Sequence, residues 1–249
     1  MNDAILTVAI AGAGFAAGAI NAVAGSGSLI TFPTLLAFGY SPLVANVSNT
    51  VGLVFGGISG AVGYRRELAG QRRRALGLAS CSLLGGLGGA VLLLALPPAV
   101  FNLVVPALIL FAVVLLLLQP RLARIRASIH ATGPGRLALP ASTLLTAVYG
   151  GYFGAAQGVM LMAALGVFVD DSLQRLTGLK NVLVAVANGA AAVVFIAHAP
   201  VAWLPALILA VSSALGGQLG ASFGRKLPTP ILRAVIVTGG LAAVVKLLL

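Results

Sequence analysis

The sequence predicts an all-α membrane protein built from an inverted repeat of two five-segment halves. Three observations predict this fold: an apolar composition, long uncharged runs, and Gly-rich motifs that recur at a fixed spacing. The chain has 249 residues, 60% hydrophobic and 8% charged, with a mean hydropathy of +1.11. Soluble domains carry about 25% charged residues and disordered chains are polar, so the composition excludes both classes. The single cysteine, Cys81, excludes an intrachain disulfide framework.

The first half of the chain holds five apolar segments, since one helical crossing needs about 20 apolar residues. The uncharged residues 4–64 are long enough for three segments, and residues 75–120 for two. Turn signals rich in Gly, Ser and Pro at 25–28, 39–42 and 97–98 separate them. The segments are 4–23, 27–38, 44–63, 75–96 and 99–118.

The second half divides in the same way. A Gly-rich stretch at 149–158 and the sequence His198-Ala199-Pro200 break its uncharged runs. The segments are 138–155, 158–169, 176–197, 201–223 and 230–248. Segments 27–38 and 158–169 are too short to span a bilayer comfortably. We therefore expect about eight full transmembrane helices and two short segments, which either cross or re-enter.

Internal motif matches predict that the two halves are related. The sequence Gly-Gly-Leu-Gly-Gly-Ala at 85–90 matches Gly-Gly-Gln-Leu-Gly-Ala at 216–221, an offset of 131. The same offset pairs Leu96-Pro97 with Leu227-Pro228 and Gly27 with Gly158, and an offset of 132 pairs Asn49 with Asn181. Several matches in one register are much less expected by chance than one. The expected organisation is an N-terminal repeat 1–118, a basic cytoplasmic linker 119–137 and a C-terminal inverted repeat 138–249.

The loop charges predict that the halves have opposite orientations in the membrane. The loop at 65–74 carries five arginines, whereas its counterpart at 198–200 has no Lys or Arg; the loop at 97–98 has none, whereas its counterpart carries Arg225 and Lys226. The positive-inside rule places the basic loops in the cytoplasm and, with ten segments, both termini outside. Charges clustered between apolar runs orient membrane proteins, so the net charge of +11 does not indicate a nucleic-acid partner.

Interrupted helices in inverted repeats are typical of secondary transporters, whose substrates bind near the midplane. The breaks at 21–28 and 149–158 would each present a helix start, where backbone N–H groups favour anions. No carboxylate lies within a span, which disfavours cation transport. A membrane scaffold or assembly protein without transport activity is the alternative. It is less favoured because broken helices in lipid need a reason.

The candidate site residues are polar or small side chains at the breaks and on the segments that follow them. Ser26 or Ser28 can cap the short helix. Lys180 is either a cation for the substrate or an interfacial anchor that snorkels. Asp170 and Asp171 are expected in a loop, where they either pair with Arg175 or end a short helix; a proton-carrier role is the less favoured alternative. We expect the substrate-binding residues to be Asn21, Gly25, Ser26, Gly27, Ser28, Asn49, Gln157, Gly158, Lys180 and Asn181.

Enzyme and cofactor motifs are missing from the sequence. It contains no H-E-x-x-H motif and no Walker motif, and its two histidines lie in a basic loop and near an interface. We therefore expect no catalytic residue, no metal site and no cofactor. The expected partners are a small anion and the lipid bilayer. The coupling ion, H⁺ or Na⁺, and the formation of a homo-oligomer are open.

Both breaks carry the resemblance to a known family. The sequence Asn-Ala-Val-Ala-Gly-Ser-Gly-Ser-Leu-Ile-Thr-Phe-Pro at 21–33, followed by Ala-Asn-Val-Ser-Asn-Thr at 45–50, resembles the TauE/SafE (sulfite exporter, DUF81) family of membrane transporters. The stretch 149–155, followed by Asp170-Asp171 and Leu179-Lys180-Asn181, resembles it too. The resemblance implies a bacterial inner-membrane permease that exports sulfite, sulfoacetate or related organosulfur anions.

This chain departs from the family pattern at both breaks. The family's glycine triplet is Gly25-Ser26-Gly27 here, and the second half keeps only Gln157-Gly158 and lacks a proline matching Pro33. These departures leave the identity of the substrate open.

The predicted topology can be tested by labelling single cysteines in a Cys81→Ser background. Cysteines near Gly70 and Gly133 should react only from the cytoplasm, and cysteines near Pro98 and Ala199 only from outside, because basic loops stay inside. Pro98 and Lys226 form the decisive pair. Labelling of both from the same side would contradict the five-plus-five arrangement.

Overall fold

The computed structural model describes residues 3–125 and 135–223 and eight positions within 237–247. Every regular element in this part of the chain is an α-helix, and the described residues contain no strand. In chain order the helices are α1 (Asp3–Val23), α2 (Ser28–Ala37), α3 (Pro42–Gly63), α4 (Arg72–Ala95), α5 (Pro98–Ile125), α6 (Gly135–Tyr152), α7 (Gln157–Phe168), α8 (Leu173–His198) and α9 (Trp203–Phe223).

The first nine expected segments each correspond to one helix. Helix α5 continues past the expected boundary at 118 to Ile125, but its membrane-length apolar part is Pro98–Leu118 and ends at that boundary. Arg, Leu and Ala favour helix, so Arg121 and Arg124 do not end it. The expected segment 230–248 lies mostly outside the described residues. The two short helices hold 10 and 12 residues, or about 15 and 18 Å, and are shorter than a bilayer is thick.

Six helices in the described chain are long and apolar enough to cross a membrane. They are α1, α3, α4, α5, α8 and α9, each over the apolar part of its length. Helix α6 has 18 residues and is not among these six. Large apolar side chains such as Val8, Leu103 and Leu145 are exposed on the outside of the bundle, as expected for surfaces that face lipid.

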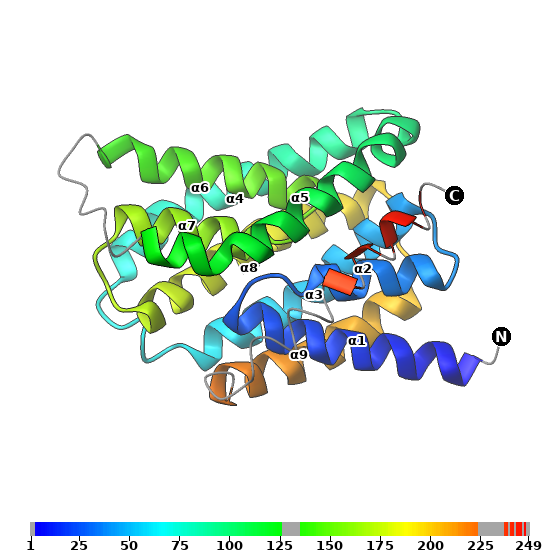
Figure 1. Ribbon diagram of the computed structural model, residues 1–249, viewed down its shortest axis with the longest axis horizontal. Helices are drawn as coiled ribbons and strands as arrows, with labels where there is room; N and C mark the ends of the chain where they lie inside the picture. The colour runs from blue at the N-terminus through cyan, green and yellow to red at the C-terminus, as the bar shows by residue number, and fades with distance from the viewer. Residues whose placement is uncertain are drawn as a thin grey trace.

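The basic connections lie at one end of the molecule. In Figure 1 the α3–α4 and α7–α8 connections and the ends of α5 and α9 lie at the left, whereas the start of α1 and the α2–α3 and α4–α5 connections lie at the right. The Asp171 carboxylate joins the two basic connections, with Arg175 at 2.7 Å and Arg74 at 3.3 Å. The expected Asp171–Arg175 pair is therefore confirmed, whereas its partner on α4 was not predicted.

The Asp171 carboxyl is held in its charged form. Burial opposes ionisation, but the hydrogen bonds from Arg175 and from the Ser172 N–H and the charges of Arg175 and Arg74 outweigh it, so the pKa of Asp171 is lowered. Arg175 also donates to the carbonyl of Ala69 at 3.0 Å. These contacts fasten the α7–α8 connection to the connection between α3 and α4.

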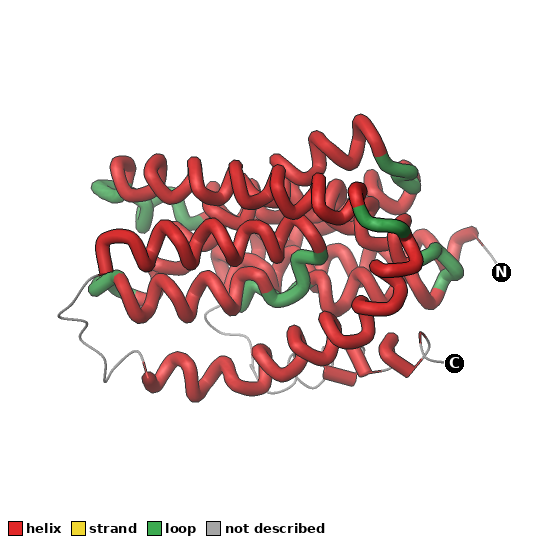
Figure 2. The backbone as a smooth tube through the Cα atoms, turned by 90° about the horizontal axis from the view of Figure 1, so that it is seen from above, coloured by secondary structure: helices red, strands yellow, loops and turns green. Residues whose placement is uncertain are grey.

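Each half of the chain contributes one helix to the other half. Helix α9 packs most extensively against α1 and α3, and α4 packs against α6 and α8. Helices α3 and α8 meet between these two groups. Figure 2 shows the helices running side by side, with most loops at the two ends of the bundle and one loop stretch in its middle.

Glycines make the close approach of these helices feasible. A Cβ on Gly217 of α9 would lie 2.6 Å from the carbonyl oxygen of Gly56 in α3, and a Cβ on Gly86 of α4 would lie 2.3 Å from that of Ala187 in α8. The two contacts are related by one offset: Gly217 lies 131 residues after Gly86, and Ala187 lies 131 residues after Gly56. The Gly-rich motifs at 85–90 and 216–221 therefore serve the same packing role in the two groups.

We predict that Gly18→Ala destabilises the bundle, whereas Gly12→Ala on the same helix does not. A Cβ at Gly18 would lie 2.1 Å from the carbonyl oxygen of Ser213, and a Cβ at Gly12 would meet nothing within 4 Å. Overpacking of this kind costs about 1–3 kcal/mol. Thermal unfolding of the two variants in detergent measures the difference. Equal midpoints would show that α1 and α9 do not pack as described.

Candidate functional site

The two breaks meet inside the bundle. The N–H of Gly158, in the first turn of α7, donates to the carbonyl of Gly25 at 3.2 Å. A Cβ on Gly25 would lie 2.4 Å from Cα of Gly158, and Gly25 has a φ of +82°, a conformation that favours glycine. The two breaks, which the sequence pairs through Gly27 and Gly158, are therefore in direct backbone contact.

The end of α1 is held by two side chains of α8. The Lys180 ammonium donates to the carbonyl of Asn21 at 2.7 Å and to that of Ala22 at 3.4 Å. The side-chain amide of Asn181 donates to Ala22 at 3.1 Å. A cation at a helix C-terminus is favoured by the helix dipole, and these donors satisfy carbonyls that have no partner within the helix.

Lys180 is completely buried, so it is not an interfacial anchor that reaches for water. Among the charged residues whose side chains the structure describes, it is the one that is buried, and no described carboxylate lies within 4 Å of it. The sequence alone left the anchor and the substrate cation open. The burial removes the first alternative and leaves a basic side chain inside the bundle.

The start of α2 is capped by a residue that lies before the break. The Gly27 N–H donates to the side-chain oxygen of Asn21 at 2.6 Å. The expectation that Ser26 or Ser28 caps α2 is wrong, since the N-cap position is Gly27 and no side-chain cap bond forms there. Asn21 takes this role because it lies in the last turn of α1, directly beside the returning chain.

The second break has its own polar contacts. The phenol of Tyr149 donates to the carbonyl of Ala155 at 2.7 Å, and the side chain of Asn46, on α3, donates to that of Tyr152 at 2.9 Å. Ala156, the N-cap of α7, has a φ of 59°. Left-handed backbone at a non-glycine residue costs about 1–2 kcal/mol, and such strain gathers at functional sites.

Two predicted site residues carry buried polar atoms without a partner in the described structure. They are the hydroxyl of Ser26 and the amide oxygen of Gln157, in side chains that are 1% and 2% exposed. Ser26 directly follows Gly25, and Gln157 directly precedes Gly158, the two glycines that touch. Buried polar groups are nearly always paired, so these unpaired groups indicate where a ligand can bind.

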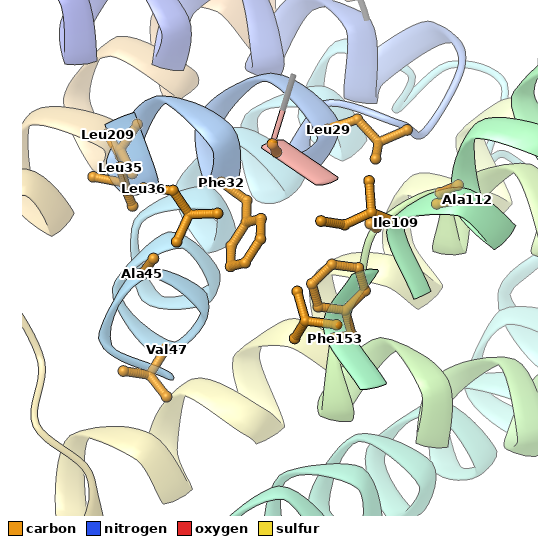
Figure 3. Packing of buried hydrophobic residues seen from close by; sticks show 14 of the residues in the cluster. Leu29, Phe32, Leu35, Leu36, Ala45, Val47, Ile109, Ala112, Phe153 and Leu209 are labelled. Atoms are coloured by element: carbon orange, nitrogen blue, oxygen red, sulfur yellow. The ribbon is translucent and has the colours of Figure 1, made fainter. Parts of the chain in front are cut away.

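Aromatic rings border the breaks on one side. The rings of Phe32 on α2 and Phe153 in the second break face each other edge-on at 5.3 Å, as Figure 3 shows. Phe101 of α5 contacts Phe153 and Tyr152 with centroids 6.3 and 5.7 Å away.

The structure brings most of the predicted residues together. Hydrogen bonds connect the breaks with each other and with α8 through Asn21, Gly25, Gly27, Gly158, Lys180 and Asn181. Asn49 contacts α2 instead, where its side-chain oxygen accepts from the hydroxyl of Thr31. Ser28 is buried beside Gly27. Sequence reasoning did not assign Asn46 or Thr31 to the site; Asn46 could have been found as a buried amide one turn before Asn49.

These features define an integral membrane transporter: a bundle of membrane-length helices in which two broken helices meet around buried polar groups and an unpaired cation. The family model of the sulfite exporter TauE/SafE matches residues 10–247, and the chain belongs to this family.

Curated relatives agree with this class. The chain is 28% identical over 235 residues to "Probable membrane transporter protein YfcA" of Escherichia coli K12, covering 91% of this chain and 84% of the relative. It is 26% identical over 236 residues to "Probable membrane transporter protein ORF9" of a Sinorhizobium species (95% and 90%), and 26% over 228 residues to a "Probable membrane transporter protein" of Haemophilus influenzae (90% and 87%). No solved structure matches the chain significantly.

We predict that Gly25→Ala disrupts the site far more than Gly39→Ala. Both glycines have positive φ, +82° and +88°, so both variants carry a similar backbone strain. A Cβ at Gly39 meets nothing within 4 Å, whereas at Gly25 it collides with Gly158. Thermal stability in detergent and substrate flux should both fall for Gly25→Ala. Equal behaviour of the two variants would show that the contact between the breaks is dispensable.

Proposed function

We propose that the protein is a secondary transporter of a small anion, acting as an exporter or permease. One observation carries this proposal: the two breaks are in backbone contact inside the bundle, and the buried Lys180 holds the end of α1 at the first break with no described carboxylate within 4 Å. Helix N-termini and a buried ammonium both favour a negative ligand. Catalysis plays no part in this proposal.

The site suits a small oxyanion. The Ser26 hydroxyl is buried without a partner among the described residues, and the nitrogen of the Gln157 amide is a second side-chain donor beside Gly158, so both can donate to an anion. Membership of the sulfite exporter family supports sulfite or an organosulfur anion such as a sulfonate. The proposed location is the bacterial inner membrane, which the protein would cross several times. The names of the bacterial relatives and the six membrane-length apolar helices among the described residues support this location.

The mechanism we propose uses two inverted repeats of five segments. The paired contacts Gly217–Gly56 and Gly86–Ala187 support this symmetry, as does the exchange of α4 and α9 between the halves. In the described structure the breaks are buried. Access from each side in turn then requires the α1, α3 and α9 group to move against the α4, α6 and α8 group, around the site between them.

The transport activity can be measured in proteoliposomes. Uptake of sulfite or an organic sulfonate should saturate with concentration and respond to an imposed ion gradient without nucleotide, because the sequence has no ATP-binding motif. A panel of carboxylates and neutral analogues defines the substrate class. Robust flux of cations or neutral solutes, without flux of any anion, would refute the proposal.

Single substitutions test the proposed contacts with the anion. Ser26→Ala, Gln157→Ala and Lys180→Gln should each weaken binding by about 1.5–3 kcal/mol, or ten- to a hundredfold in affinity, since each removes a donor to a charged ligand. Ser222→Ala removes an exposed hydroxyl on α9 and serves as the control. Unchanged affinity in all three properly inserted variants would place the substrate elsewhere.

A further inference from the structure

The last turns of α1 and α6 have the same backbone geometry but different partners. In α1 the Ile20 carbonyl accepts from the N–H groups of residues 24 and 25, at 2.7 and 3.1 Å. In α6 the Tyr149 carbonyl accepts from residues 153 and 154, at 2.9 and 3.2 Å. Both turns end on a glycine of positive φ, Gly25 and Gly154. The carbonyls that follow the two turns are therefore equivalent.

A cation occupies this position at one helix end only. The carbonyls of Asn21 and Ala22, which follow the turn in α1, accept from the Lys180 ammonium. The equivalent carbonyls in α6 belong to Gly150 and Gly151, and no described residue donates a hydrogen bond to them across the break. Since helix C-termini carry partial negative charge, the end of α6 lacks the compensation that α1 receives.

Two side-chain oxygens without partners lie at the same end of α6. The Asn46 amide nitrogen donates to the Tyr152 carbonyl, which fixes the orientation of this amide and leaves its oxygen buried and unpaired. The Gln157 amide lies against Gly150, where a Cβ would come within 2.2 Å of its carbon, and its oxygen is also buried and unpaired. The end of α6 thus presents several oxygen acceptors that have no partner among the described residues.

We infer that a monovalent alkali cation binds here, on the carbonyls of Gly150 and Gly151 and the side-chain oxygens of Asn46 and Gln157. Oxygen donors suit hard cations, and the carbonyls of broken helices bind coupling ions in other transporters. The set contains no carboxylate among the described residues, so it suits a single rather than a double charge. This site takes, at α6, the place of the Lys180 ammonium at α1.

The inference deepens the proposed function, because it supplies a coupling ion. Gln157 carries its oxygen toward the cation and an N–H₂ group that is a donor for the anion, so one side chain connects both ligands. Cation binding would then favour anion binding. Lys180 contributes the fixed charge of the first half, and the bound cation contributes the exchangeable charge of the second.

Cation binding is measured on the purified protein in detergent, without substrate. NaCl or KCl should raise the unfolding midpoint saturably, by about 2–4 °C, relative to N-methylglucamine chloride at equal ionic strength. Asn46→Ala should abolish this shift, and Asn46→Asp, which retains an oxygen and adds a charge, should enlarge it. If Asn46→Ala does not fold, Asn46→Asp alone decides the outcome.

Thr143→Ala is the control, because Thr143 also has a buried, unpaired side-chain oxygen but lies in α6 about two turns before Gly150. It should keep the full shift. An equal shift with N-methylglucamine, a full shift in Asn46→Ala or a shift lost equally in Thr143→Ala would overturn the cation site. Anion flux that persists in Asn46→Ala without a response to Na⁺ or K⁺ would retain the proposed function and confirm the cation as its coupling ion. If the wild-type protein shows no anion flux but its unfolding midpoint still rises with Na⁺ or K⁺, the transport proposal is refuted and the cation site is retained.

Discussion

The structure depends on how two interrupted helices satisfy their backbone inside lipid. A break releases N–H and C=O groups, and hydrocarbon offers no partner for them. The hydrogen bond from Gly158 to Gly25 pairs one set directly. Side chains from the opposite half reach several others: Lys180 and Asn181 at the end of α1, and Asn46 at the end of α6. Each break is therefore stable only in the presence of the other half.

The exchange of α4 and α9 follows from the same requirement. Helix α9 reaches α1 and α3 through glycines and hydroxyls, with Ser59 donating to the Ala214 carbonyl at 2.6 Å and Ser213 to that of Gly52 at 3.3 Å. Small residues let backbones approach closely where the hydrophobic effect does not drive helices together. Close backbone contacts of this kind hold α9 against α1 and α3.

The sequence was informative where a residue type has one local meaning. Glycines, serines and prolines predicted both breaks, and charge-free runs predicted nine of the helices. It was less informative about partners that lie far apart in the chain. The sequence predicted Ser26 or Ser28 as the cap of α2, but in the fold the side chain of Asn21 accepts from the N–H at the start of this helix. Only the packing of α8 against α1 shows that Lys180 is buried rather than interfacial. The contact between Asn46 and Tyr152 spans 106 residues and has no local signal.

The position of α9 between α1 and α3 has a consequence for biosynthesis. About 140 residues separate the end of α3 from the start of α9. At about 5–20 residues per second, the ribosome needs roughly 7–30 s to deliver this partner. During that interval the glycine-lined faces of α1 and α3 are in the membrane without their neighbour. The packing of α1 and α3 against α9 can therefore form only after α9 has been synthesised and inserted.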